Sequence, residues 1–285
     1  MAITNGAKAS GADAYTVSNP FRTRILSGEV VPVMTAKGFI TNEMPMFCKM
    51  AGIHGVFIEM EHSSLGMREV APLVLACNYA GVSPIVRVPS KAHWHISRAL
   101  DAGAAAVVIP HVESVQEVRD IVKAGKFPPM GARGCTNAQP LLNFQTVPTG
   151  VQNELLNSES MLIPMIETPG AVELCEEILA IEGVDGILIG SNDLTTDMGI
   201  PGQYDNPLYQ DAVTRIVLAG KKAGKPIGIG GIANRTDLLE KWFAMGASWS
   251  LSGQDLAILQ AGLKKVGQSY VEINKRVSKA REDTS

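Results

Sequence analysis

The sequence is poor in cysteine, and its four cysteines stand far apart. They are Cys48, Cys77, Cys135 and Cys175, and no two of them form a C-x-x-C pair. The missing pair argues against a cysteine zinc site, and the N-terminal stretch has no apolar core of a signal peptide, which argues against a disulfide framework. We therefore expect free thiols in a reducing compartment, with Cys135 in a polar loop, and a cytoplasmic protein.

Long apolar runs and blocks of like charge are also missing. The longest apolar stretches, such as Ala104–Pro110, are strand-length and fall short of the about 18 residues of a membrane span. The net charge is −3 and the basic residues are scattered, so we expect neither nucleic acid nor a membrane as partner. No G-x-G-x-x-G follows the first expected strand, which argues against a nucleotide-cofactor enzyme.

What the sequence does contain is one pattern repeated along 285 residues, of which 46% are hydrophobic and 19% charged. An amphipathic segment ends in glycine, which supplies the left-handed position that closes a helix, and a short apolar run follows. The runs are continuous rather than alternating, which is typical of parallel strands covered on both faces. The expected strands are residues 30–34, 55–58, 84–88, 105–109, 161–166, 186–189, 227–229 and 248–251.

Eight strand–helix units of about 25–30 residues predict a single closed (β/α)₈ barrel, with a doubly wound open sheet as the alternative. We expect a flexible tail or loosely docked arm over residues 1–22 and the barrel over residues 23–285. The charged segment 269–285 is expected to form an extra C-terminal helix. Segment 126–160 is rich in Pro, Gly, Asn and Gln, and connections of that length are commonly functional.

Polar residues follow several of these strands directly. In a parallel barrel the reacting side chains lie at the carboxyl ends of the strands, so these residues should meet at one mouth. Glu167 and Asp193 follow neighbouring strands, and two carboxylates without a nearby histidine or cysteine suit a hard cation such as Mg²⁺. We therefore expect Glu167 and Asp193 to bind a metal, with an ordinary capping role as the alternative. The other rim residues are Glu59, Glu61, His62, Arg87, His111, Ser191 and Asn192.

Four of these rim residues are candidates for catalysis. Arg87 lies between two valines in an apolar strand, so its charge needs a partner or a ligand. His62 follows Glu59 by three residues, and a carboxylate bonded to an imidazole would fix its tautomer and raise its basicity. His111 directly follows a strand and should face the mouth. The alternatives are an ion pair inside the barrel for Arg87 and a solvated loop position for His62.

Together these motifs resemble the HpcH/HpaI aldolase family, the metal-dependent class II pyruvate aldolases. The resemblance runs from about Gly28 to Leu263 and rests on Ile58–His62, Ile85–Ser90, Gly131–Gly134, Ile166–Thr168, Gly183–Gly186 and Gly190–Leu194 with Asp197–Gly199.

The resemblance implies a role for each site residue. Glu167 and Asp193 would bind Mg²⁺ or another divalent cation such as Mn²⁺ or Co²⁺. Arg87 would hold the keto oxygen of a 2-keto acid substrate. His62, positioned by Glu59, would serve the acid–base step. Backbone amides of Ser191, Asn192 and Asp193 would hold the substrate carboxylate. The chain would form a homo-oligomer, a hexamer with exchanged C-terminal helices.

Three positions depart from the family pattern. Glu59 stands where Asp is usual, and Met165 stands where Gln is common. His111 does not fit the pattern of the bacterial aldolases. It resembles instead the pattern of macrophomate synthase, a fungal relative that decarboxylates oxaloacetate and adds the enolate to a 2-pyrone. The tyrosine which that enzyme uses in the long loop has no counterpart in segment 126–160.

The expected function is that of a carbon–carbon lyase. It would form a metal-bound pyruvate enolate by reversible aldol cleavage of a 4-hydroxy-2-oxo acid. The alternatives are decarboxylation of oxaloacetate with addition of the enolate to a second substrate, and a non-catalytic binding barrel.

Overall fold

Eight parallel strands close into one barrel in a computed structural model that describes residues 15–284. Each strand pairs with its sequence neighbours, and β8 pairs with β1 to complete the ring. The predicted (β/α)₈ barrel is confirmed, and the open-sheet alternative is wrong. The strands are β1 (Val31–Ala36), β2 (Gly55–Glu59), β3 (Ser83–Arg87), β4 (Ala106–Ile109), β5 (Met161–Ile166), β6 (Ile187–Gly190), β7 (Ile227–Gly230) and β8 (Trp249–Gln254).

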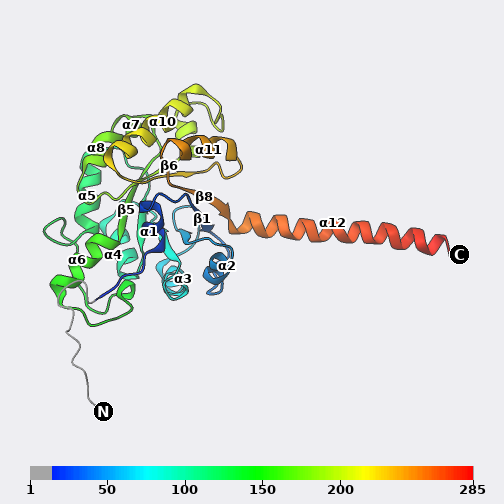
Figure 1. The fold of residues 1–285 in the computed structure, drawn as a ribbon, viewed down its shortest axis with the longest axis horizontal. Helices are drawn as coiled ribbons and strands as arrows, with labels where there is room; N and C mark the ends of the chain where they lie inside the picture. The colour runs from blue at the N-terminus through cyan, green and yellow to red at the C-terminus, as the bar shows by residue number, and fades with distance from the viewer. Residues whose placement is uncertain (1–14, 285) are drawn as a thin grey trace, which may run out of the picture.

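Helices surround this barrel, and a last long helix leaves it (Figure 1). Five of the predicted terminal glycines have positive φ just past their helices, as a helix-closing position requires: Gly52, Gly81, Gly103, Gly224 and Gly246. The helices are α1 (Pro20–Leu26), α2 (Met44–Met50), α3 (Met67–Ala80), α4 (His93–Asp101), α5 (Val115–Gly125), the 3₁₀ turn η2 (Pro140–Leu142), α6 (Thr149–Glu159), α7 (Pro169–Glu173), α8 (Cys175–Ala180), α9 (Ser191–Asp197), α10 (Pro207–Ala223), α11 (Thr236–Met245) and α12 (Asp255–Glu282).

The strands bury side chains on both faces, which explains their continuous apolar runs. Val33, Phe57 and Val108 belong to an inner cluster that fills the barrel. Val56 and Ile58, on the opposite face of β2, belong to the outer cluster between the strands and the helices. An apolar side chain is therefore needed at nearly every position of a central strand.

The segment before β1 closes the N-terminal end of the barrel. Phe21 is fully buried, and its ring meets Trp249 edge to face at 5.2 Å. Asn19 caps α1 and donates to the backbone oxygens of Ala105 and Glu159. Residues 1–14 of the expected tail lie outside the described residues. Residues 19–22 are docked on the barrel, so the expected boundary at residue 22 falls inside α1.

The long segment 126–160 also lies at the N-terminal end, because it connects the end of α5 to the start of β5. It contains η2 and α6, and it packs its own apolar cluster, including Phe127, Leu142 and Leu156, against Ala105. The functional role expected for this segment stays a prediction, and the segment lies at the end opposite the predicted site. The four cysteines are free thiols, and Cys135 in this segment is exposed.

The last helix, α12, projects from the barrel as a single straight rod (Figure 1). It has 28 residues, and within the described residues no helix is long and apolar enough to cross a membrane. Apolar side chains recur along α12 at alternating intervals of three and four residues, the spacing of a helix that packs against a partner. They are Leu256, Leu259, Leu263, Val266, Tyr270, Ile273 and Val277, all exposed in the single chain.

Candidate active site

The predicted site residues gather at the carboxyl ends of the strands. Glu59 is the last residue of β2 and stands in register with Arg87, the last residue of β3. His111 follows β4, Glu167 follows β5, and α9 with Asp193 follows β6. The barrel therefore brings together side chains that are up to 134 residues apart in the sequence (193 − 59 = 134).

Arg87 is held between two carboxylates. Its Nε and Nη2 both donate to Oε2 of Glu59, with an Nε–Oε2 distance of 2.8 Å, and its Nη1 lies 2.9 Å from Oε2 of Glu61. Arg87 and Glu59 are both buried, so the guanidinium is fixed in one orientation by charge-assisted bonds. Its Nη1 also lies 3.6 Å from the sulfur of Met165.

The expected bond between Glu59 and the His62 ring is absent. Oε1 of Glu59 instead accepts from the backbone N–H of Glu61 at 2.7 Å and of His62 at 3.1 Å. The carboxylate therefore shapes the turn that carries His62, while the imidazole itself is half exposed and stands 3.7 Å from Oε2 of Glu61. The spacing of three residues brings Glu59 to the backbone of His62 because the chain turns back directly after β2.

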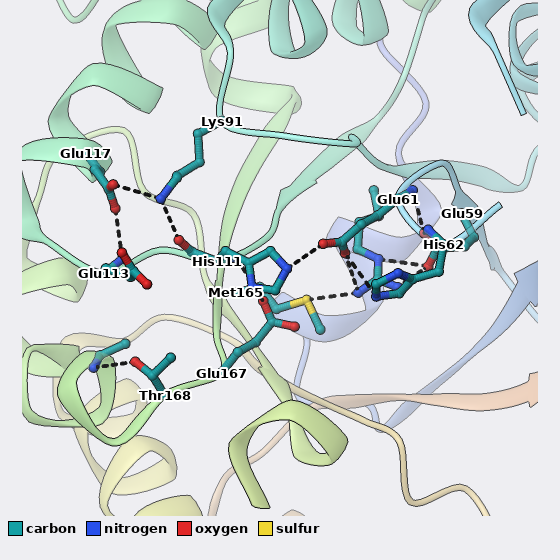
Figure 2. Close-up of polar contacts among 12 residues, drawn as sticks. Glu59, Glu61, His62, Lys91, His111, Glu113, Glu117, Met165, Glu167 and Thr168 are labelled. Carbon is teal, nitrogen blue, oxygen red and sulfur yellow. Dashed lines mark hydrogen bonds and ion pairs between the residues drawn. The ribbon is translucent and has the colours of Figure 1, made fainter. Parts of the chain in front are cut away.

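His111 bridges two carboxylates across the mouth (Figure 2). Its Nε2 lies 2.7 Å from Oε1 of Glu61, and its Nδ1 lies 3.5 Å from Oε2 of Glu167. The backbone of His111 adopts a left-handed conformation with φ of 52°, which is costly for a residue other than glycine. Two bonds hold it there, from its N–H to Glu167 Oε2 and from the Lys91 ammonium to its carbonyl, each 2.8 Å long.

Glu167 is the most unusual group of the site. Its side chain is 1% exposed, and burial raises its pKa to about 7, against the lowering effects of the His111 N–H and ring. Its Oε1 is buried and has no hydrogen-bond partner within residues 15–284. A side chain on Gly190 would come within 2.7 Å of this carboxylate, so the last residue of β6 must be glycine for Glu167 to lie there.

This arrangement fits a divalent cation. Glu167 offers a buried carboxylate oxygen without a donor, and Asp193, whose charge acts on Glu167, offers a second carboxylate. Among the described residues no group of three His, Cys, Asp or Glu side chains could hold a metal. A cation here would therefore take its remaining oxygens from water or substrate, as Mg²⁺ commonly does.

The first turn of α9 carries the three residues expected to bind substrate. The hydroxyl of Ser191 is fully buried and accepts from the Tyr209 hydroxyl at 2.7 Å, so only its backbone can serve a ligand. Oδ1 of Asn192 accepts from the Tyr204 hydroxyl. Asp193 is partly exposed. The N–H groups of a first turn have no partner inside the helix and favour an anion.

A cavity of about 690 Å³ opens at this end of the barrel. Glu167 and His111 stand beside the cavity. Six of the predicted residues line it: Glu59, His62, Arg87, Ser191, Asn192 and Asp193. The opposite part of its wall comes from β7, β8, the start of α12 and Lys37 after β1. The cavity is larger than a three-carbon acid requires, so it has room for a second reactant.

Glu61 was expected at the rim from the sequence, without a role of its own. In the structure the Glu61 carboxylate lies within ion-pair distance of Arg87, His111 and His62. Its position directly after β2 was the available signal. Lys91 and Lys37 were missed altogether, since nothing in a lone lysine after a strand distinguishes it from a solvated one.

A closed parallel barrel with buried carboxylates and a fixed arginine at its carboxyl end has the layout of a barrel enzyme. The chain belongs to the HpcH/HpaI aldolase/citrate lyase family, whose model matches residues 40–261. The predicted family membership is confirmed.

Relatives and solved structures agree with this assignment. A 4-hydroxy-4-methyl-2-oxoglutarate aldolase of Chaetomium globosum is 33% identical over 224 residues, which cover 78% of this chain and 83% of that protein. The crystal structure of an HpcH/HpaI aldolase from Desulfitobacterium hafniense superimposes with a TM-score of 0.81 at 28% identity, over 87% of this chain and 95% of that one. Macrophomate synthase shares the fold, with a TM-score of 0.73 at 24% identity over 88% and 90% of the two chains.

Proposed function

We infer that this protein is a carbon–carbon lyase that cleaves a 4-hydroxy-2-oxo acid reversibly into pyruvate and a second carbonyl compound. The observation that carries this proposal is the meeting of a fixed, buried arginine with a buried carboxylate that lacks a donor, beside a cavity with room for two reactants. Family membership and the aldolase relative from Chaetomium globosum support the reaction class.

Arg87 has the geometry to stabilise an enolate. Cleavage moves an electron pair onto the keto oxygen of the pyruvyl half, and a cationic group already in place stabilises that charge without reorganising. Glu59 and Glu61 keep the guanidinium in position through contacts on Nε, Nη1 and Nη2. Lysine would be a poor substitute, because it lacks the planar fork that two carboxylates grip.

The proton of the 4-hydroxyl group needs an acceptor, and His62 is our candidate. Its ring is half exposed, lines the cavity and lies 3.7 Å from Oε2 of Glu61. The turn that carries His62 is held by Glu59 through two backbone N–H groups. The imidazole can therefore take a proton from a bound substrate while its backbone stays fixed.

A divalent cation, Mg²⁺ or a similar ion, is part of the proposal. Glu167 and Asp193 would hold it, and it would add positive charge beside the keto oxygen. Chelator treatment is expected to abolish activity, and added Mg²⁺ or Mn²⁺ is expected to restore it. Full activity in the presence of chelator would contradict this part of the proposal.

Decarboxylation of oxaloacetate is a second candidate, and His111 is the observation that favours it. This residue spans Glu61 and Glu167 at the mouth. The two reactions differ in their need for a base, because loss of CO₂ needs only an electron sink. His62→Ala separates the two reactions, because general-base help is typically worth about 10²–10⁴-fold. If the assignment is right, the variant loses that factor on a 4-hydroxy-2-oxo acid and keeps its rate on oxaloacetate. Equal losses on both substrates would show that His62 is not the base.

We also propose that the chain forms a homo-oligomer through α12. Beyond its first turns, this helix of 28 residues contacts no other element within the described part of its own chain. Its apolar side chains at heptad spacing are exposed, and such a face is normally covered. A hexamer is the size that the family resemblance implies. Light scattering on the full chain tests this, and Leu263→Lys is expected to lower the mass, whereas Lys264→Met beside it is not.

The cytoplasm is the compartment that we propose. Three of the four thiols are buried and all four are free, as is usual for proteins kept in a reducing environment. Fractionation of the native host measures this directly.

A further inference from the structure

Lys37 carries a positive charge to the side of the cavity opposite the metal-binding carboxylates. It follows β1, which stands across an eight-stranded ring from β5, and it lines the cavity together with Asp193 and Arg87. Within residues 15–284 the Lys37 ammonium makes no hydrogen bond or ion pair, whereas Arg87 is paired with Glu59 and Glu61.

The loop that presents Lys37 is fixed rather than loose. Oδ2 of the buried Asp255 accepts from the backbone N–H of Lys37, Gly38 and Phe39, at 2.9, 2.8 and 2.6 Å. Leu256 packs on Gly38 so closely that an added Cβ would lie 2.8 Å from it. Asp255 is thus fully engaged with the backbone and does not neutralise the Lys37 side chain.

The surroundings of Lys37 fit the non-pyruvyl half of a substrate. Arg87, Glu167 and Asp193 occupy the side of β3, β5 and β6, where the proposed function places the pyruvyl group. The remaining wall is apolar or uncharged, formed by Leu251, Ala257, Ile258, Ala261, Asn234 and Gln254. A lone cation in such a wall attracts one negative charge and gains strength from the low polarity around it.

We propose that Lys37 is the residue that selects, among 4-hydroxy-2-oxo acids, those whose second half carries a carboxylate. This inference rests on the proposed function. In the cleavage the C3–C4 bond breaks and its electron pair passes to C3 and the C2 oxygen. The 4-hydroxyl proton goes to the base, C3 takes up a proton, and C4 becomes the carbonyl of a second oxo acid. Lys37 holds the carboxylate of that oxo acid before and after cleavage.

Two substrates that differ in one group test the proposal. 4-Hydroxy-4-methyl-2-oxoglutarate carries a carboxylate on C4, and 4-hydroxy-4-methyl-2-oxopentanoate carries a methyl group there; both release pyruvate, which is measured. Lys37→Met is expected to lower kcat/KM for the first by about 10- to 100-fold and to leave the second within about twofold. Lys37→Arg should keep most of the preference. Lys123→Met, in the last turn of α5 at the other end of the barrel, removes the same charge and should change neither rate.

The possible outcomes are distinct. Equal effects of Lys37→Met on both substrates, or none on either, would overturn the role of Lys37 while the lyase assignment stands. A metal-supplied wild-type enzyme that cleaves neither substrate would overturn the proposed function and this inference with it. If Lys37→Met does not fold, as judged by circular dichroism, Lys37→Gln replaces it in the same comparison.

Discussion

The two ends of the barrel differ in what they bury, an apolar contact at one end and a carboxylate at the other. At the N-terminal end Phe21 and Trp249 meet edge to face, both fully buried, and every contact between them is apolar. At the carboxyl end Glu167 is equally buried, yet one of its oxygens has no donor and its pKa is raised to about 7, chiefly by burial. The Phe21–Trp249 contact needs no further partner, whereas Glu167 has a buried oxygen that a ligand would satisfy.

This difference shows where stability and function were placed. An apolar plug lowers the free energy of the folded chain, while a buried carboxylate without a partner raises it. The barrel tolerates the buried carboxylate because the apolar plug and the two large cores stabilise the fold independently of it. Removing the Phe21 ring should therefore lower stability and leave activity unchanged. Removing the charge of Glu167 should lower activity without lowering stability.

The largest expected effect concerns Glu167. Glu167→Gln keeps the shape but removes the negative charge, so activity should fall by about 10³-fold or more, since a bound cation supplies several kcal/mol to such reactions. Because the folded pKa lies above the unfolded value of about 4.3, ionisation of Glu167 opposes folding as pH rises toward 7. The metal-free variant should thus unfold at the same temperature as wild type or a higher one at pH 8. A lower unfolding temperature of the variant at pH 8 would show that Glu167 stabilises the fold, which would contradict the contrast between the two ends.

The next effect concerns the plug. Phe21→Ala should lower the free energy of unfolding by about 3–5 kcal/mol, the usual cost of emptying a buried aromatic site. Activity per folded molecule should be unchanged well below the unfolding temperature. Phe144→Ala is the control, because this side chain is 46% exposed and its loss should cost far less. Thermal unfolding followed by circular dichroism, with rates measured in parallel, checks both variants.

The smallest effect is a pH dependence of cation binding. Protons and Mg²⁺ compete for Glu167, so Mg²⁺ affinity should rise about tenfold per pH unit up to about pH 7, the raised pKa of this carboxyl, and then level off. Calorimetric titration with Mg²⁺ between pH 5.5 and 8.5 measures the slope. An affinity that stays constant over this range would mean that Glu167 is not a ligand.

The fold followed from the sequence because parallel strands must be apolar on both faces, and β2, β4 and β5 could be found from their runs alone. Side chains directly after strands were then placed at one end by topology, which located Glu59, Arg87 and Glu167. Which groups bind one another was not predictable. Glu59 turned to Arg87 rather than to the His62 ring, because such pairings depend on side-chain geometry after folding. Helix α6 was also missed, since only Gln152 and Leu156 of its residues are buried.

Asp255 joins the loop after β1 to the start of α12. Its carboxylate grips the loop at residues 37–39, and the helix that it begins supplies Ala257, Ile258 and Ala261 to the cavity wall. Segments separated by more than two hundred positions thus behave as one exchangeable part. A designer who wishes to change the second substrate should transplant residues 37–39 together with 251–261, because either piece grafted alone would arrive without the anchor that shapes it.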